Sequence, residues 1–196
     1  MIRPAQVVVI LSVVFGTACI MLNPPMRGPD EQAHFARVFA YSHGVVLPST
    51  EVNGRRGVFV PADLHDDFAF FNAHRHDIWT PGFSFRSVLD EHRARAGAVA
   101  STGPPPPRDP VFVPFEGSEG YTAIAYAPHI LAAAIANWLG LDFVTMVAVM
   151  RLAGLATFTV VSALAVATTP RLKWAFVLIA MLPASLYGRA VIGADG

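Results

Sequence analysis

Long apolar runs and one long polar stretch alternate along the chain. The apolar runs cover residues 5–22, 121–138, 143–168 and 172–192. Each approaches the length of about 20 apolar residues that a helix needs to cross a bilayer. The pattern predicts an all-α polytopic membrane protein with three or four membrane helices. We expect a transmembrane helix over 1–22, an apolar helix over 121–140 that re-enters or spans, and transmembrane helices over 142–169 and 172–192.

A cleaved signal peptide is the alternative for the first run, but its apolar region has only about 7–15 residues. This run is longer, and no small-residue cleavage pattern precedes Asn23. We therefore expect an uncleaved helix with a cytoplasmic N-terminus, which the positive charge of Arg3 weakly favours. The single cysteine, Cys19, excludes an internal disulfide. A lipoprotein signal is less favoured, because Gly16 stands where that signal has a leucine-like residue.

Residues 23–120 form the polar stretch, which we interpret as an external loop with juxtamembrane helices. Within it, Pro29-Asp30-Glu31 resembles a helix start, because proline and acidic residues favour the first turn of a helix. A proline run at 103–107 predicts a stiff extended spacer. Residues 65–77 mix aromatic, acidic and histidine side chains without clean periodicity, which indicates irregular or short helices near the membrane surface.

The charges flanking the last two runs decide between two topologies. If all four runs span and the N-terminus is cytoplasmic, Arg171 and Lys173 lie outside, against the positive-inside rule. If 121–140 enters without crossing, both residues are cytoplasmic, and the polar loop and Asp195 face the exterior. We prefer the second arrangement, in a bacterial inner (plasma) membrane.

Composition agrees with this division into apolar and polar parts. The 196 residues are 54% hydrophobic and 14% charged, with a formal net charge of +0. Soluble proteins have about 25% charged residues. No basic stripe or net positive field is present to bind nucleic acid. Most acidic residues and histidines lie in the polar loop, so chemistry that needs polar groups is expected there.

Asp30 and Glu31 are the leading candidates for catalysis. They follow the first apolar run closely, so a carboxylate there would lie at the bilayer surface and could act as a general base. The alternative is that acidic residues at this position only stabilise the helix start. Arg151 lies well inside its apolar run. A buried membrane charge usually faces protein or water, so Arg151 either serves a site or pairs with an acidic neighbour.

Other polar residues have competing interpretations. His34 lies one turn after Asp30 and could bond its carboxylate or reach a phosphate. Arg189 lies near a helix end, which favours interfacial anchoring. We expect no cofactor or metal. The alternative is Mg²⁺ or Mn²⁺ on Asp30 and His34, or on a set of loop residues. That set consists of His65, Asp66, His74, His76 and Asp77.

Several segments resemble one bacterial family of predicted membrane proteins, domain-of-unknown-function family 2142. The first segment, 29–37, reads Pro-Asp-Glu-Gln-Ala-His-Phe-Ala-Arg and matches the Pro-Asp-Glu-x-x-His-Phe signature of that family. Further similarity lies in residues 121–128, in Met150-Arg151-Leu152, in Leu182-Pro183 and in the closing Gly193-Ala194-Asp195-Gly196. The similarity covers both ends of the chain and thins out between about residues 46 and 110.

That family resembles the GT-C glycosyltransferases, multi-helix membrane enzymes that use lipid-phosphate-linked sugars. The resemblance implies a GT-C-like N-terminal module, with Asp30 and Glu31 as the catalytic residues and Asp30 as the base. It also implies that His34, Arg37, Arg151 and Asp195 bind substrate or lipid phosphate. The implied activity is inverting transfer of a sugar from a polyprenyl-phosphate donor to a glycan or protein acceptor of the cell envelope.

A non-catalytic role is the competing hypothesis: part of a transporter, or a scaffold whose external loop binds a partner. GT-C enzymes generally have many more helices than this sequence contains. We therefore expect these residues to be the N-terminal part of a longer GT-C-like domain, inactive on its own. A downstream reading frame that continues the helix pattern would favour the enzyme.

Overall fold

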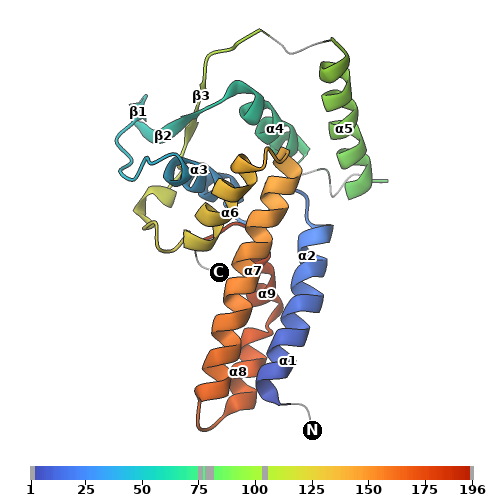
Figure 1. The fold of residues 1–196 in the computed structure, drawn as a ribbon, viewed down its shortest axis with the longest axis vertical. Coiled ribbons are helices and arrows are strands. Elements are labelled where there is room, and N and C mark those ends of the chain that lie inside the picture. Colours follow the sequence, from blue (N-terminus) through green and yellow to red (C-terminus); the bar gives the residue numbers. More distant parts are fainter. Residues whose placement is uncertain (1–2, 75–76, 78–81, 103–105, 195–196) are drawn as a thin grey trace.

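The computed structural model describes residues 3–74, 77, 82–102 and 106–194. They form a narrow helical stem with a wider head at one end (Figure 1). The stem comprises α1 (Pro4–Leu11), the π-helical turn η1 (Ser12–Gly16), α2 (Thr17–Leu22), the long α7 (Phe143–Thr168), α8 (Lys173–Ala180) and α9 (Pro183–Arg189). The head comprises residues 23–142.

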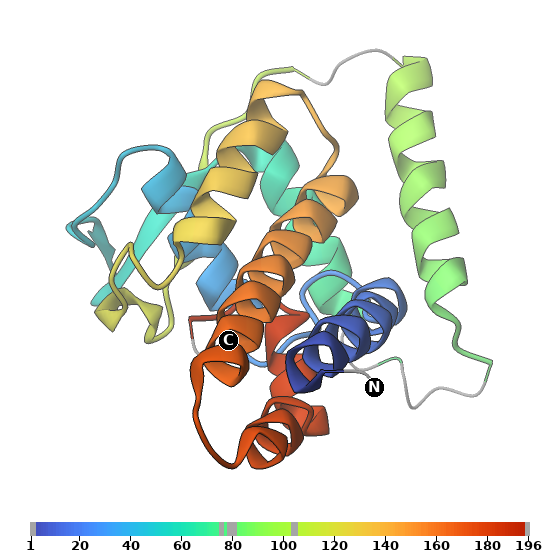
Figure 2. The same ribbon diagram turned by 60° about the horizontal axis from the view of Figure 1, so that its bottom comes forward.

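Two helices of the described residues are long and apolar enough to cross a membrane, Pro4–Leu22 and Phe143–Thr168. They pack closely where Gly16 meets α7: a Cβ atom at Gly16 would lie 2.4 Å from Leu155 Cδ1. Small residues permit such close contact between membrane helices. At the other end of the stem, Val8, Val166 and Val177 form one buried cluster, so α1, α7 and α8 are neighbours (Figure 2).

The two remaining apolar runs do not form helices of spanning length. Residues 172–192 were predicted to be one helix, but they contain α8 and α9, separated before Pro183. Proline has no N–H to continue a helix and is tolerated in the first turn of a new one. The run at 121–140 contains α6 (Ala127–Trp138). Its 12 residues extend about 18 Å, short of the roughly 30 Å hydrocarbon core.

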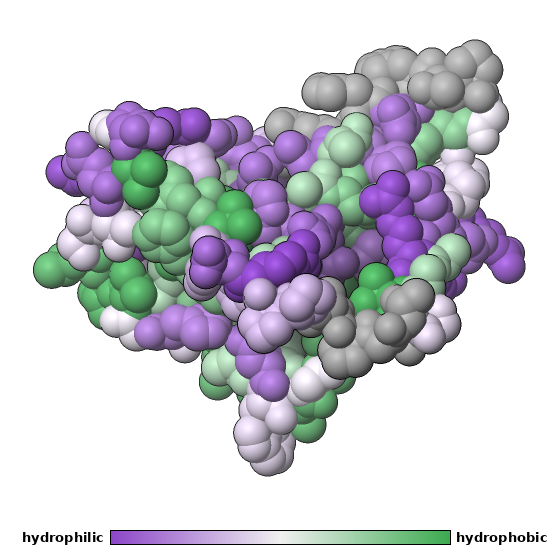
Figure 3. All heavy atoms as spheres, turned by 90° about the horizontal axis from the view of Figure 1, so that it is seen from above, coloured by the Kyte–Doolittle hydropathy of each residue, from purple (hydrophilic) through white to green (hydrophobic). Residues whose placement is uncertain are grey.

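The head is built around α3 (Glu31–Ser42), which is buried along most of its length. Phe35 of α3 packs against Phe68 of α4 (Ala62–Ala73) and Phe143 of α7. α6 covers another side of α3 and lies against the first half of α7. The helix α5 (Phe85–Thr102) joins this core through Val88, which is buried in the same cluster. Seen from the end opposite the stem, hydrophilic side chains cover much of the head (Figure 3).

A three-stranded antiparallel sheet completes the head, although the sequence was interpreted as all-α. It consists of β1 (Glu51–Val52), β2 (Arg55–Val60) and β3 (Val111–Pro114), in that order. The turn between β1 and β2 is Asn53-Gly54, and both residues have positive φ, 52° and 75°. Asn-Gly between two extended segments is a strong signal for a two-residue hairpin. The 3₁₀ turn η3 (Ser118–Gly120) follows the sheet.

Candidate functional site

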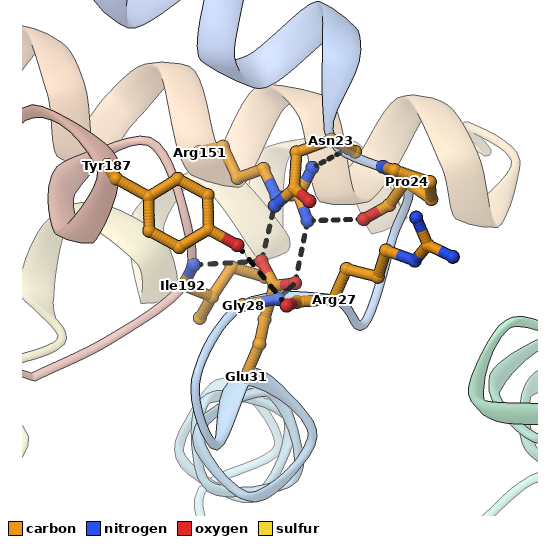
Figure 4. Close-up of polar contacts among 8 residues, drawn as sticks. All are labelled: Asn23, Pro24, Arg27, Gly28, Glu31, Arg151, Tyr187 and Ile192. Atoms are coloured by element: carbon orange, nitrogen blue, oxygen red, sulfur yellow. Dashed lines mark hydrogen bonds and ion pairs between the residues drawn. The ribbon is translucent and has the colours of Figure 1, made fainter. Parts of the chain in front are cut away.

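A buried ion pair joins the polar loop to the long stem helix. Glu31 begins α3, and Arg151 lies on α7, 120 positions later. Arg151 Nε donates to Glu31 Oε1 at 2.7 Å, and Nη2 donates to Oε2 at 2.6 Å. The Glu31 and Arg151 side chains are 0% and 2% exposed. The guanidinium and carboxylate thus meet as two parallel bonds, the strongest arrangement for this pair (Figure 4).

Backbone groups supply the other bonds of this pair. The amide of Gly28 donates to Glu31 Oε2, and the amide of Ile192 donates to Oε1, both at 3.0 Å. Arg151 also donates to the carbonyls of Asn23, at 2.5 Å, and Pro24, at 2.8 Å. We call Glu31, Arg151 and these four backbone groups the interfacial clamp. It fixes the end of the first stem helix, the start of α3, the middle of α7 and the segment after α9 to one another.

The clamp lies at the junction of stem and head. Arg151 bonds the carbonyls of Asn23 and Pro24, which directly follow the end of α2 at Leu22. From Arg151 to Thr168, α7 rises about 26 Å, which is close to the rise of about 27 Å from Pro4 to Leu22. If these two lengths cross the bilayer together, Arg151 lies at its boundary. The expectation that Arg151 is deep in a membrane helix came from measuring depth from the start of α7.

Asp30 has the opposite environment from its neighbour Glu31. Its side chain is exposed and makes no capping hydrogen bond to α3, which it immediately precedes. Its backbone has φ 49° and ψ 16°, in the left-handed region. For a residue other than glycine this conformation is uncommon, costs of order 1 kcal/mol, and is enriched at functional sites. The two adjacent carboxylates therefore differ in environment: Glu31 is bonded within the clamp, and Asp30 faces solvent.

The structure brings only some of the predicted site residues together. Glu31 and Arg151 are directly bonded, and an acidic partner was one of the two interpretations of Arg151. His34 is buried and shares a 2.6 Å hydrogen bond between its Nδ1 and the Tyr126 hydroxyl, whereas Asp30 is exposed. Arg37 is buried one turn further along α3 and bonds the Tyr41 hydroxyl at 2.6 Å. Asp195, predicted to bind substrate, lies outside the described residues.

The histidines of the polar loop connect helices in the described part of the head. His92 of α5 bonds Asp67 of α4 at 2.7 Å, and His74 Nε2 lies 3.6 Å from a Glu91 oxygen. Burial raises the pKa of Asp67, and the hydrogen bond from His92 partly offsets this. No group of three or more histidine, cysteine or acidic residues that could hold a metal ion is found among the described residues.

Several residues of this region were not found from the sequence. Gly28 is one: a Cβ there would lie 2.7 Å from Val191 Cβ and 3.0 Å from Glu31 Cβ, so glycine allows the loop to approach the clamp. Tyr187 of α9 donates its hydroxyl to the Arg27 carbonyl at 3.3 Å. Ile192 contributes only a backbone amide. Contacts made by backbone groups, such as the Ile192 amide and the Arg27 carbonyl, leave no signal in the pattern of side chains along a sequence.

The family comparison gives one result. The family model described as Predicted membrane protein (DUF2142) matches residues 13–196. This range contains both clamp side chains and Asp30. No curated protein and no solved structure matches the chain.

Proposed function

The chain belongs to the DUF2142 family of predicted membrane proteins, and we propose that it contributes the catalytic base of a membrane glycosyltransferase. The observation that carries the proposal is the pairing of an exposed, left-handed Asp30 with a buried, fully bonded Glu31 at the junction of stem and head. The predicted family membership is confirmed. The resemblance to GT-C enzymes remains part of this proposal.

The position of Asp30 suits a reaction between a lipid and a water-soluble acceptor. A sugar linked to a polyprenyl phosphate keeps its phosphate at the bilayer surface, while the acceptor hydroxyl of a cell-envelope glycan or protein arrives from water. The first helix of spanning length ends at Leu22, directly before the carbonyl of Asn23 that Arg151 bonds in the clamp, which supports a surface position for Asp30. A base at this height can reach both reactants.

The proposed step is a single displacement. Asp30 removes the proton from the acceptor hydroxyl as its oxygen forms a bond to the anomeric carbon. The bond between that carbon and the lipid-phosphate oxygen breaks, and the phosphate leaves with the electron pair. One attack from the opposite face inverts the anomeric centre. Glu31 and Arg151 act as positioning residues, because their bonds are made within the clamp rather than with substrate.

Charge placement supports an orientation for the proposed enzyme in the inner membrane. The N-terminal end of α1 and the loop between α7 and α8 lie at the same end of the stem, opposite the head (Figure 1). This end carries Arg3, Arg171 and Lys173. The positive-inside rule places such an end in the cytoplasm. The head, with Asp30, would then face the exterior or periplasm.

The competing proposal is a non-catalytic scaffold whose external head binds a partner. To distinguish the two, the chain would be expressed with its native downstream sequence in membranes. Transfer of labelled sugar from polyprenyl-phosphate donors into envelope glycans would then be measured for the wild type and for Asp30→Asn. Asp63→Asn is the matched control, because Asp63 is also exposed and lies in the first turn of a head helix, α4.

We expect Asp30→Asn to abolish most transfer at unchanged protein level, because loss of a general base costs about 10²–10⁴-fold in rate. Asp63→Asn should retain wild-type transfer. Equal product from Asp30→Asn and the wild type would refute the base assignment and favour the scaffold. Equal loss in both aspartate variants would indicate a general charge effect of the head instead.

A further inference from the structure

Arg189 is a charged residue of the stem that takes no part in the interfacial clamp. It is the last residue of α9 and is partly buried. Its Nη1 donates to the carbonyl of Ala180, the last residue of α8, at 3.1 Å. Its guanidinium lies over the ring of Phe158 on α7. Three stem helices therefore determine where this positive charge lies.

The position of Phe158 along α7 gives the depth of the guanidinium in the stem. Phe158 lies seven residues after Arg151, which the clamp places at the boundary with the head, and ten residues before Thr168. At about 1.5 Å per residue, these separations are about 10 Å and 15 Å. The charge of Arg189 is therefore well inside the length of α7 that would cross the bilayer.

The side chain of Arg189 points away from the nearer surface. α8 ends at Ala180, and α9 then leads back towards the clamp, where the Ile192 amide bonds Glu31 (Figure 1). To reach the Ala180 carbonyl, the Arg189 side chain extends towards the middle of the stem. An arginine that anchors a helix at a membrane surface extends its charge towards water instead. The interfacial anchoring that the sequence favoured does not describe this geometry.

One edge of the Arg189 guanidinium has no partner. Its Nε and Nη2 make no hydrogen bond within the described part of the chain, and neither is a fully buried nitrogen. These two nitrogens lie on the same edge of the guanidinium. Arg151 uses this same edge to donate two parallel bonds to Glu31. The open edge of Arg189 can therefore bind a carboxylate in the same way.

The stem supplies no carboxylate for this edge. Residues 1–22 and 143–194 contain no aspartate or glutamate, so a second copy of the stem would bring none either. A lipid phosphate stays at the bilayer surface, about 10 Å from this depth. A charged side chain inside a membrane usually pairs with another polar group of protein. An acidic side chain on a further membrane helix is the group whose charge and depth fit.

The surface around the break between α8 and α9 can accept such a helix. Leu178, Ile179 and Leu182 are 70%, 60% and 52% exposed. On α7, Val161 lies about one turn after Phe158 and is 59% exposed. These apolar side chains can contact lipid or another helix equally well. The charge of Arg189 therefore decides in favour of a helix with an acidic residue.

We propose that Arg189 is the docking point for a membrane helix of a partner protein that carries a carboxylate near the middle of the bilayer. The carboxylate accepts two parallel bonds from Nε and Nη2, and the apolar remainder of the partner helix packs beside the end of α8. The Ala180 carbonyl and the Phe158 ring hold the guanidinium in place. This assignment does not rest on the proposed transferase activity.

The test uses the full chain in phosphatidylcholine vesicles, with synthetic peptides in place of the partner. Each peptide is a helix of about 20 alanine and leucine residues, the length that crosses a bilayer. One peptide has a glutamate at its centre, one has a glutamine at its centre, and one has a glutamate in its first turn. Förster transfer from the tryptophans of the chain to a dansyl group on the peptide measures binding.

We expect the peptide with a central glutamate to bind at least about tenfold more tightly than the glutamine peptide, because bonds between charged groups are stronger than bonds to a neutral amide. Moving the glutamate to the first turn should remove this advantage, since it shifts the carboxylate by about 15 Å along the helix. Equal binding of the central glutamate and glutamine peptides would overturn the proposal. Equal binding of the two glutamate peptides would overturn the assigned depth.

Variants of the chain form the second arm. Arg189→Met should lose the preference for the central glutamate. The matched control is Arg171→Met, because Arg171 is exposed at the end of the stem opposite the head; it should keep the preference. Asp30→Asn should also keep it, which separates failure of this site from failure of the catalytic proposal. A preference that survives in Arg189→Met would overturn the assignment. The peptide comparison on the unmodified protein remains decisive even where a variant does not fold.

Discussion

The interfacial clamp gives the sharpest test of the structure, because Glu31 and Arg151 depend on each other for every charged bond they make. Arg151→Met removes two bonds to the carboxylate and two bonds to backbone carbonyls. The Glu31 carboxylate then stays buried with only the amides of Gly28 and Ile192. Removing one partner of a buried ion pair costs about 3–5 kcal/mol in free energy of unfolding, and we expect Arg151→Met to fall in this range.

Glu31→Gln is expected to be costly for a geometric reason. Each carboxylate oxygen accepts one bond from Arg151 and one from a backbone amide. A glutamine amide replaces one of these oxygens with an NH₂ group, which then faces two donors in either orientation. In a protein that already carries Arg151→Met, the effect of Glu31→Gln on the free energy of unfolding should reverse in sign. There, Glu31→Gln neutralises a buried unpaired carboxylate, so it should leave stability unchanged or increase it.

The assay is equilibrium unfolding of the full chain in mixed micelles by titration of sodium dodecyl sulfate, followed by circular dichroism. Arg55→Met is the matched control. Arg55 pairs with Glu116 at 2.6 Å, the same distance as the shorter clamp bond between side chains, but the two side chains are 58% and 51% exposed. An exposed pair of this kind contributes less than about 1 kcal/mol. The clamp is refuted if Arg151→Met costs no more than Arg55→Met, or if Glu31→Gln costs the same with and without Arg151→Met.

Two further predictions concern residues near the clamp. Gly28→Ala should lower the free energy of unfolding by about 1–3 kcal/mol in the same assay, because the added methyl collides with Val191 and crowds Glu31. Gly188→Ala has open space and should cost little; similar losses in both variants would contradict the collision. Burial lowers the pKa of His129 on α6 from 6.5 to about 4, so the unfolded chain binds a proton in this pH range and the folded chain does not. Stability should be fully present above pH 6.5 and fall by about 3 kcal/mol as the pH drops to 4. His129→Leu removes the titrating ring and should abolish this pH dependence. It breaks no hydrogen bond of the ring, since neither ring nitrogen has a partner among the described residues. An unchanged pH dependence of stability in this variant would assign it to other groups.

The membrane character of the chain could be predicted from the sequence because hydropathy is a local property. The runs at 1–22 and 142–169 coincide with the two helices of spanning length. The same local signal overestimated the length of the helix at 172–192, where Pro183 divides the run. A hydropathy pattern does not show where proline interrupts the backbone hydrogen bonds of a helix. The sheet was missed although Asn53-Gly54 indicated a hairpin. Its flanking strands carry Glu51, Arg55 and Arg56 and show no long alternating pattern.

The candidate site was predictable in its residues but not in their arrangement. The Pro-Asp-Glu segment and Arg151 were identified separately, and an acidic partner for Arg151 was one of two interpretations. The choice of Glu31 over Asp30 depends on a contact across 120 positions, which no local pattern encodes. Successive residues at a helix start point in directions about 100° apart. One carboxylate can therefore face α7 while its neighbour faces solvent.

The different environments of Glu31 and Asp30 link the structural role of the clamp to the proposed chemistry. The clamp fixes the start of α3 to the end of α2 and to α7 at Arg151, and the height of Asp30 relative to the bilayer therefore depends on it. Asp30 is held in a left-handed conformation directly before the clamped residue. Loss of Asp30 should therefore remove turnover and leave stability unchanged, whereas loss of Arg151 should lower both. If Arg151→Met instead retained full turnover per folded molecule, Asp30 would not need the clamp, and its position would have to be fixed by the core of the head alone.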